Sequence, residues 1–267
     1  MTVGVKPAVV VQGLHKEFTQ KGDNVVALTD VNLSIPDGEF ASIVGPSGCG
    51  KSTLLYILGG FVKPSSGKAY SEGKLITGPG VDRGIVFQEY ALFPWLTVYD
   101  NIAYGLRRKG VGEARIRQTV ERYISLIHLD GFEQRYPREL SGGMRQRVAL
   151  ARTFAYEPDI QLLDEPFGAL DAQTREFMQD ELLRLWESSG KTVIMVTHDI
   201  GEAVYLSNKI YVMSRRPGTM VREFNVDMDR KLGREAVTLS DAYAHLRNEV
   251  WLAVREQVLR SGQEQSA

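Results

Sequence analysis

The sequence predicts an α/β fold with a mainly parallel, doubly wound sheet at its centre. Short apolar runs with strand character alternate with segments of helical periodicity along most of the 267 residues, which is the pattern of such sheets. Two glycine-rich loops, at residues 45–50 and 140–143, each stand where a helix begins. A helix N-terminus offers unpaired N–H groups and a positive dipole end to an anion, so the same loops predict phosphate binding.

Composition limits the classes of function that are open to the chain. Apolar residues make up 43% of it and the net charge is −1, so a sizeable core is available and no excess of positive charge favours nucleic acid or an anionic membrane. The apolar stretch 8–11 is too short for a signal peptide, and no run approaches the ~20 apolar residues that span a bilayer. Any membrane role is therefore expected to come through a partner.

Cysteine and histidine are sparse. The single cysteine, Cys49, excludes an internal disulfide and favours a reducing compartment. We interpret it as a small residue tolerated in a tight turn rather than a catalytic thiol, because no histidine lies near it in the sequence. His15, His128 and His245 are interpreted as surface or packing residues.

The first elements are mostly strands. Residues 8–35 alternate between apolar and polar positions, and residues 40–44 form a short apolar strand that runs into the first glycine loop. A helix is predicted over 51–58, ended by two glycines, and strand character returns at 66–76.

The middle of the chain is predicted to be helical from about residue 97 to 139. Apolar side chains recur there at spacings of three and four, with Arg and Glu on the other side. The residues of this stripe are Ile116, Val120, Ile124 and Ile127. A further helix follows Ser141 and ends at Pro158.

Strands and helices alternate again toward the end of the chain. Two buried strands are predicted at 160–163 and 192–196, separated by a helix over about 172–187. The last helix is predicted over about 241–259, and its apolar stripe favours packing on its own domain over a contact with another subunit. The stripe consists of Tyr243, Leu246, Val250 and Val254.

The first glycine loop fits the pattern G-x-x-x-x-G-K-[S/T] and stands between a strand and a helix, as a phosphate-binding loop does. Its glycines let the backbone wrap around phosphate oxygens, Lys51 is expected to reach the terminal phosphates, and the Ser52 hydroxyl to bind Mg²⁺. The nucleotide-binding residues predicted in this segment are Gly45, Pro46, Ser47, Gly48, Cys49, Gly50, Lys51, Ser52 and Thr53.

Two carboxylates end the apolar strand at 160–163. Asp164 suits the shell of a metal ion, and Glu165 suits the polarisation of an attacking water. A solvated acidic turn is the alternative, and it is disfavoured alongside the glycine loop. Gln161 is unexpected inside a buried strand, so its amide must find hydrogen-bond partners or face a less buried side.

Three further residues are candidates for the same site. His198 directly follows the strand 192–196, and the carboxyl ends of parallel strands form the edge at which such sheets bind ligands. Lys51, Glu165 and His198 are therefore expected to converge on one terminal phosphate. Gln88 ends the apolar run 84–87 and can bind Mg²⁺ or orient water. Phe18 can stack on adenine if it is exposed, and from the residues alone it is equally a core phenylalanine.

In order, these motifs resemble the nucleotide-binding subunit of an ABC transporter over nearly the whole chain. Leu140-Ser-Gly-Gly is the most specific element, because it is that family's signature. The resemblance implies a P-loop NTPase fold with an N-terminal antiparallel β subdomain and a helical insert at about 97–157. It implies an ATPase domain at 8–240 and a C-terminal helix and tail at 241–267.

The resemblance also assigns roles to residues. It implies Walker A at Gly45 to Thr53, the Q-loop at Gln88, Walker B at Ile160 to Glu165, the D-loop around Asp171, and His198 as the switch histidine. It implies that Phe18 stacks on adenine, that ATP and Mg²⁺ are the cofactors, and that Ser52, Gln88 and Asp164 hold the metal.

Reciprocal pairing of two chains follows from the same resemblance. In the family, two cassettes dimerise head to tail, so Ser141, Gly142 and Gly143 of one chain close over the γ-phosphate bound by the other. Two phosphate cradles facing one apparent set of catalytic residues fit such a two-fold pair. Met144 departs from the Gln common in the family, which affects local packing but leaves the Ser-Gly-Gly donors in place.

A finer resemblance is to importers of the nitrate, sulfonate and taurine type. It rests on residues 87–98 and on the tail from Arg216-Pro-Gly. It implies a homodimer on the cytoplasmic face of the inner membrane, two integral membrane permease subunits, an indirect role for a solute-binding protein, and no nucleic acid. The residues near Tyr90–Trp95 would then help to line a docking groove.

Two other functions are weighed against this one. An ABC-type ATPase acting on nucleic acid or ribosomes usually carries tandem cassettes, a long coiled-coil insert or a basic surface, and the sequence shows none of these. A P-loop kinase would transfer the phosphate to a small molecule, and the signature segment speaks against it.

Overall fold

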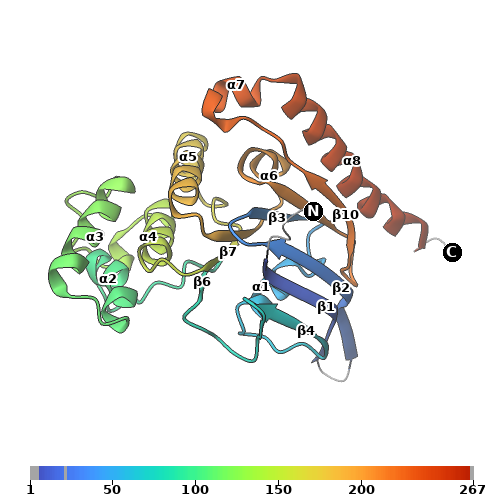
Figure 1. Cartoon of the computed structure of the whole chain (residues 1–267), viewed down its shortest axis with the longest axis horizontal. Helices are drawn as coiled ribbons and strands as arrows, with labels where there is room; N and C mark the ends of the chain where they lie inside the picture. The colour runs from blue at the N-terminus through green and yellow to red at the C-terminus, as the bar shows by residue number, and fades with distance from the viewer. Residues whose placement is uncertain (1–5, 21–22, 265–267) are drawn as a thin grey trace. The chain divides into compact units, whose positions relative to one another are not determined.

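The structure, a computed structural model, describes residues 6–20 and 23–264. They divide into two compact units (Figure 1). The first combines residues up to 80 with those from 190 onward, and the second runs from Val81 to Ser189. Each unit is described by itself.

An antiparallel sheet opens the first unit. It contains β1 (Pro7–Gln20), β2 (Asp23–Pro36), β4 (Ser66–Ser71) and β5 (Lys74–Leu75), in the order β2-β1-β4-β5. From Val31 to Ile35, buried apolar residues of β2 alternate with exposed polar residues, which is the pattern of a strand with one covered face. The predicted antiparallel β subdomain is therefore confirmed. The predicted strand 66–76 is two strands, because Glu72 and Gly73 turn the chain with positive φ angles of 49° and 77°.

Parallel strands form the centre of the first unit. β3 (Phe40–Val44) pairs in parallel with β8 (Thr192–Val196) on one side and with β9 (Lys209–Met213) on the other. β10 (Met220–Asn225) adds to β9 in antiparallel direction. The predictions did not include β9 and β10, although the apolar run in β9 has the length and β-branched content of a buried strand.

Helices α1 (Lys51–Leu58), α6 (Ile200–Leu206) and α8 (Asp241–Glu264) of the first unit pack on these strands, and α7 (Arg234–Thr238) packs against α8. A short 3₁₀ turn, η2 (Arg230–Leu232), precedes α7. Helix α8 buries Val250 and Ala253 in a cluster with residues of β3, α6 and β9. Tyr243, Leu246 and Val254 pack against the same cluster, so the predicted packing of this helix on its own domain is confirmed.

The second unit carries two parallel strands and the helical insert. β6 (Arg83–Val86) pairs in parallel with β7 (Ile160–Asp164). The helices are α2 (Val98–Arg108), α3 (Glu113–Leu126), η1 (Pro137–Glu139), α4 (Gly142–Ala155) and α5 (Ala172–Ser189). All four residues of the predicted stripe at 116–127 are buried to 1% exposure or less, and α2, α3 and α4 lie together in Figure 1.

Among the helices that the structure describes, none is both long enough and apolar enough to cross a bilayer.

Candidate functional site

The first glycine loop lies between β3 and α1 and depends on its glycines. Gly48 and Gly50 have φ angles of +73° and +107°, a region that side chains other than glycine rarely adopt. A Cβ on Gly50 would also lie 2.7 Å from Leu28 Cδ2 and 2.9 Å from Ala27 O. The loop is therefore a tight backbone turn at the N-terminus of α1, which suits the binding of an anion.

Lys51 is folded onto this loop. Its side chain is buried, and Nζ donates hydrogen bonds of 2.9 Å to the carbonyl oxygens of both Gly45 and Pro46. The ammonium group is thus held at the loop by backbone acceptors rather than by a carboxylate. Burial raises the pKa of the nearby Cys49 thiol, with Lys51 opposing the shift, so Cys49 fits the role of a tolerated small residue.

A turn from the C-terminal part of the chain supports the loop from behind. Gly218 donates to Ala27 O and accepts from Thr29 N, at 2.9 and 3.0 Å. A Cβ on Gly218 would overlap the carbonyl of Cys49, so only glycine fits there. No structural role was predicted for Gly218. The Arg216-Pro-Gly segment marks its position in the sequence, but it contributed only to the resemblance to importers.

His198 follows β8 at the same edge of the sheet as the glycine loop. β3 and β8 are parallel neighbours, with Ile43 opposite Val196, and Thr197 N donates to Ile43 O at 3.3 Å. The Thr197 hydroxyl donates to Glu202 at 2.8 Å and accepts from Asp199 N at 3.0 Å. His198 itself is exposed, on a turn that these bonds fix.

Phe18 lies near the end of β1 and is not a core residue. Its side chain is 36% exposed, and Lys16 Nζ lies 4.6 Å from the centre of its ring. The structure thus excludes the core interpretation and leaves a partly exposed aromatic ring, with Lys16 over one face, that could stack on another flat group.

In the second unit, the structure brings Gln88 and Glu165 together. Asp164 ends β7 and is fully buried, while Glu165 is half-buried with a left-handed φ of 48°. Gln88 Nε2 donates to Glu165 Oε2 at 3.3 Å. From α4, Gln146 Nε2 donates to the carbonyls of Glu165 and Pro166. The turn after β7 is therefore held so that the Glu165 carboxylate reaches the Gln88 amide.

The amide of Gln161 was expected to find hydrogen-bond partners or to face a less buried side, and this prediction was wrong for the amide oxygen. Gln161 is 2% exposed, and its buried Oε1 accepts no hydrogen bond. Its partner in the register of β6 and β7 is Gly84, which has no side chain to donate one. The cost of this unpaired acceptor is about 1–3 kcal/mol.

The second glycine loop begins α4. Ser141 is the N-cap, and its Oγ accepts from Met144 N at 3.2 Å. Leu140 is buried, whereas Ser141 is exposed, so this helix N-terminus opens to the surface of its unit. Met144 contributes its N–H to the cap, which any residue can do. Asp171 is exposed, and the backbone N–H of Thr174 lowers the pKa of its carboxylate.

The segment after Gln88 carries strain and aromatic side chains. Tyr90 and Ala91 have left-handed φ angles of 36° and 45°. Arg152 of α4 donates to Ala91 O at 2.8 Å and to Tyr90 O at 3.5 Å, and its guanidinium lies 5.3 Å from the Phe93 ring. Phe93 contacts the exposed rings of Trp95 and Tyr104, with centroids 5.7 and 4.5 Å apart.

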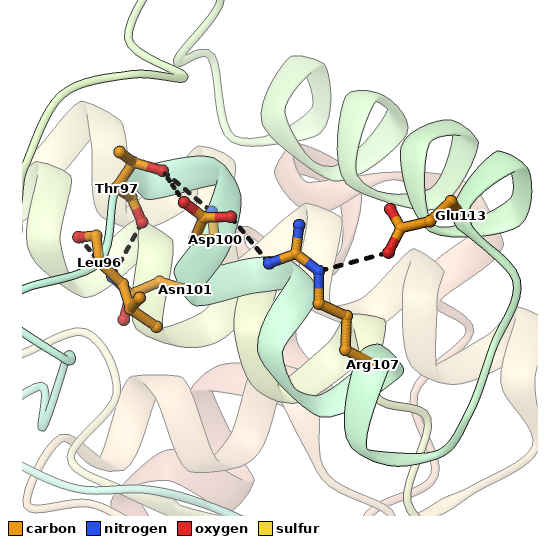
Figure 2. A network of polar contacts seen from close by, with 6 residues as sticks. All are labelled: Leu96, Thr97, Asp100, Asn101, Arg107 and Glu113. Carbon is orange, nitrogen blue, oxygen red and sulfur yellow. Dashed lines mark hydrogen bonds and ion pairs between the residues drawn. The ribbon is translucent and has the colours of Figure 1, made fainter.

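Asn101 closes this segment against α2 (Figure 2). It is fully buried, its Oδ1 accepts from Phe93 N at 2.9 Å, and its Nδ2 contacts the carbonyls of Phe93, Leu96 and Thr97 at 2.9–3.2 Å. Asp100 bonds Thr97 and Arg107 beside it. The sequence analysis missed Asn101 and Arg152. The position of Asn101 on the buried stripe of α2 was a signal, whereas nothing in the sequence singles out Arg152.

Among the described residues, no group of three or more His, Cys, Asp or Glu could hold a metal by itself. Of the predicted metal ligands, Ser52 belongs to the first unit and Gln88 and Asp164 to the second. The prediction includes one carboxylate, and Mg²⁺ usually completes its coordination with phosphate oxygens and water. At Gly48 no atom lies within 4 Å of the place where a Cβ would stand, so the backbone of the loop is open there, which suits a phosphate.

A parallel-strand unit with a glycine loop, and a helical unit with a second loop, define a nucleotide-binding cassette of the P-loop class. The family model described as "ABC transporter" matches residues 28–168. An uncharacterized ABC transporter ATP-binding protein of Methanocaldococcus jannaschii is 44% identical over 257 residues, which cover 96% of this chain and 95% of that protein. The chain belongs to the ABC transporter family.

Named relatives and solved structures agree with this assignment. A taurine import ATP-binding protein of Pelagibacter ubique is 49% identical, and a nitrate import ATP-binding protein of Synechocystis is 47% identical, each over 80% of this chain and over 82% and 81% of the relative. The dimeric structure of an ATP-binding cassette with ADP and Pi has 35% identity and a TM-score of 0.75, covering 82% of this chain and 99% of that one. The predicted family, fold and subfamily resemblance are confirmed.

Proposed function

We propose that this chain is the ATP-binding and ATP-hydrolysing subunit of an importer for a small anion or small organic solute. The observation that carries the proposal is the signature loop at an exposed helix N-terminus, in a chain whose first glycine loop already forms a phosphate cradle. A single nucleotide site needs one such cradle, so the second is available to a nucleotide held by another copy.

Residues of the first unit would hold the nucleotide. The N–H groups of the loop Gly45–Gly50 and of the first turn of α1, at Lys51, Ser52 and Thr53, would surround the phosphate oxygens. Lys51 would exchange its two carbonyl partners for the terminal phosphates, which attract an ammonium group more strongly. Phe18 would stack on the adenine.

Three residues would hold Mg²⁺ beside the phosphates: Ser52, Gln88 and Asp164. The ion would supply charge neutralisation on the phosphate oxygens. Asp164 is fully buried at the end of β7, where a carboxylate would act through a water or directly. Gln88 would then contact both the metal ion and Glu165, because its amide already donates to the Glu165 carboxylate.

Glu165 would act as the base that orients and polarises the attacking water. The left-handed backbone of Glu165 turns the residue away from the direction of β7. Gln88 donates to its carboxylate, and Gln146 donates to its backbone carbonyl. His198 would steady the terminal phosphate from the turn after β8. Phosphoryl transfer mainly needs positioning and charge neutralisation, which this set can supply.

Two copies would pair head to tail and exchange their signature loops. Ser141, Gly142 and Gly143 of each copy would cover the terminal phosphate in the other, and Asp171 would lie near the interface. This arrangement is a two-fold pair in which both loops are used.

The pair would drive two permease subunits at the inner face of the cell membrane. The names of the relatives, which include nitrate, taurine and aliphatic sulfonate importers, support an importer of small anionic or organic solutes with a solute-binding protein as an indirect partner. The exposed rings of Trp95 and Tyr104 beside Phe93 would contribute to the docking surface for the permease.

The variant Glu165→Gln tests the proposed catalytic role. It keeps the hydrogen-bonding shape but removes the base, so we expect ATP binding to persist and turnover to fall by about 10²-fold or more. ATP should then hold the variant as a dimer in sedimentation velocity. Turnover close to that of the native chain would refute the assignment.

A further inference from the structure

The turn at Tyr90–Ala91 is held in a conformation that its own residues disfavour. Two successive residues other than glycine adopt left-handed φ angles there, and each such residue is less stable than the right-handed form by an amount equivalent to a roughly tenfold population change. Such a turn persists only where its surroundings hold it. The contacts that hold it are therefore informative.

Arg152 supplies these contacts from helix α4. Its guanidinium donates to the carbonyl of each strained residue, at 2.8 Å to Ala91 and 3.5 Å to Tyr90, and lies over the ring of Phe93. Among the described residues, no ion pair joins Arg152 to a carboxylate. The guanidinium of Arg152 instead contacts the two backbone carbonyls of the turn and the face of the Phe93 ring.

The two ends of α4 differ in what they contact. The N-terminus is the signature loop at Ser141, and the last turn carries Arg152. From the strained turn, the chain leads to Gln88 in one direction and to Phe93, Trp95 and Asn101 in the other. A continuous helix thus connects the loop that would contact the partner's nucleotide with the segment that would face the permease.

We propose that Arg152 is a positioning residue that fixes the Tyr90–Ala91 turn to α4, so that movement of the signature end of the helix is passed to the aromatic surface. The inference deepens the proposed function and rests on it for the identity of the two ends. The clamp itself is a property of the isolated chain and can be tested alone.

Hydrogen exchange measured by mass spectrometry tests the clamp in the full chain without nucleotide or permease. The N–H groups of Phe93 and Leu96 are bonded to Asn101 Oδ1 and Phe93 O, so they report on the order of the segment. Arg152→Ala should raise exchange in peptides covering 89–97 by about tenfold or more, as expected for loss of hydrogen bonds from a charged donor.

Arg147→Ala is the matched control, because Arg147 also lies on α4 and also donates to a backbone carbonyl, that of Ile127 at 2.7 Å. It should loosen the end of α3 and leave exchange in 89–97 at the native rate. Unchanged exchange in Arg152→Ala, or an equal rise in both variants, would overturn the clamp.

A second substitution distinguishes a lost clamp from a damaged fold. Ala91→Gly keeps the carbonyl but removes the penalty for the left-handed conformation. Added to Arg152→Ala, it should lower the exchange of 89–97 again by about tenfold. If the double variant exchanges as fast as Arg152→Ala, strain at this turn is not what Arg152 opposes, and the proposal fails.

The coupling role is tested after reconstitution with the membrane subunits in vesicles. Nitrate, taurine and an aliphatic sulfonate are added in turn, and the one that stimulates the native chain serves as the probe. ATP affinity of Arg152→Ala should remain near native, while the stimulation of ATPase activity by that probe should fall about fivefold or more, and Ala91→Gly should restore part of it. Native stimulation in Arg152→Ala would overturn the coupling role. If the native chain itself shows no stimulation, the proposed function fails, whereas the exchange result on the clamp stands.

Discussion

Lys51 shows how a single side chain can be prepared for its ligand. Its ammonium group donates hydrogen bonds of 2.9 Å to two loop carbonyls. The flexible stem that reaches these carbonyls can also reach an anion bound at the loop, so the donor already lies at the place where a phosphate would bind. Little ordering of the side chain is then needed on binding.

The variant Lys51→Ala should bind ATP about 10- to 100-fold more weakly, because it loses a charge-assisted contact to the phosphates. Isothermal titration calorimetry measures this directly. Lys63→Ala, at an exposed lysine of the same unit, is the control and should bind normally. Equal affinities for both variants would remove Lys51 from the site.

Tyr123 gives the second unit a defined response to alkaline pH. Burial raises the pKa of its phenol to about 12, with Glu157 adding to the shift and Arg122 opposing it. The folded chain therefore keeps the proton longer than the unfolded chain, whose tyrosine titrates near 10. The stabilisation is complete below pH 10 and is lost as the pH rises through 12.

We therefore expect the native chain to lose about 2–3 kcal/mol of unfolding free energy relative to Tyr123→Phe between pH 9.5 and about 12. Urea unfolding at a series of pH values gives the difference. Tyr136→Phe, at an exposed tyrosine, should follow the native curve. Parallel curves for the native chain and Tyr123→Phe would show that the phenol is not protected by burial.

At the scale of elements, α8 belongs to the core of the unit that holds the first glycine loop. Val250 is fully buried against Val44, the last residue of β3, and against residues of α6 and β9. On the other side of the same helix, Trp251 and Leu252 are about half exposed. One stripe of the helix therefore contributes to stability and the other does not.

The variant Val250→Ala should cost about 1–3 kcal/mol of unfolding free energy, because it leaves a cavity in a packed cluster. Leu252→Ala removes more carbon atoms but from an exposed position, so its effect should stay within about 0.5 kcal/mol. Denaturant midpoints measure both. A larger loss in Leu252→Ala than in Val250→Ala would show that the exposed face is covered in solution.

Elements with strong periodicity or flanking glycines could be predicted from the sequence to within a few residues. Helix α1 and strands β3 and β8 have the predicted bounds, because both strands are fully buried apolar runs and the helix is bounded by glycines on each side. Strands β9 and β10 were not predicted. β10 is exposed on most positions, so its apolar pattern is weak, and the short helix α6 before β9 obscured the alternation.

The site residues divide in the same way. Lys51, Ser141 and Glu165 could be proposed because their chemistry is written in short local motifs. Arg152, Asn101 and Gly218 were not proposed, because their roles depend on particular backbone groups: the carbonyls of Tyr90 and Ala91, the loop before Thr97, and the carbonyl of Cys49. The buried stripe of α2 and the Arg216-Pro-Gly segment mark the positions of Asn101 and Gly218, but nothing in the sequence identifies the backbone groups that these residues contact.

At the scale of the whole molecule, the two glycine loops of one chain need not serve the same nucleotide. In the proposed head-to-tail pair, each complete site would combine Lys51 of one copy with Ser141 of the other, and the exposed N-cap at Ser141 is compatible with this. The two defects Lys51→Ala and Ser141→Glu should therefore complement each other across copies.

We expect each variant alone to hydrolyse ATP poorly, and an equal mixture to recover about a quarter of native activity, since half of the pairs are mixed and each has one intact site. Phosphate release measures this. A mixture of Lys51→Ala with the double variant should recover nothing, because no pair then has a complete site. Activity of the first mixture equal to the average of its components would contradict shared sites.

The burial of Val44 under Val250 and Ala253 has a consequence for synthesis. On the ribosome, the glycine loop emerges about two hundred residues before the helix that covers the strand leading into it. Until α8 leaves the exit tunnel, the apolar residues at the end of β3 that cluster with α8 stay uncovered by that helix. Exposed apolar surface of this kind makes nascent chains prone to aggregation. A transcript truncated shortly before residue 250 would therefore yield a polypeptide that contains every nucleotide-binding motif and still depends on chaperones or is degraded.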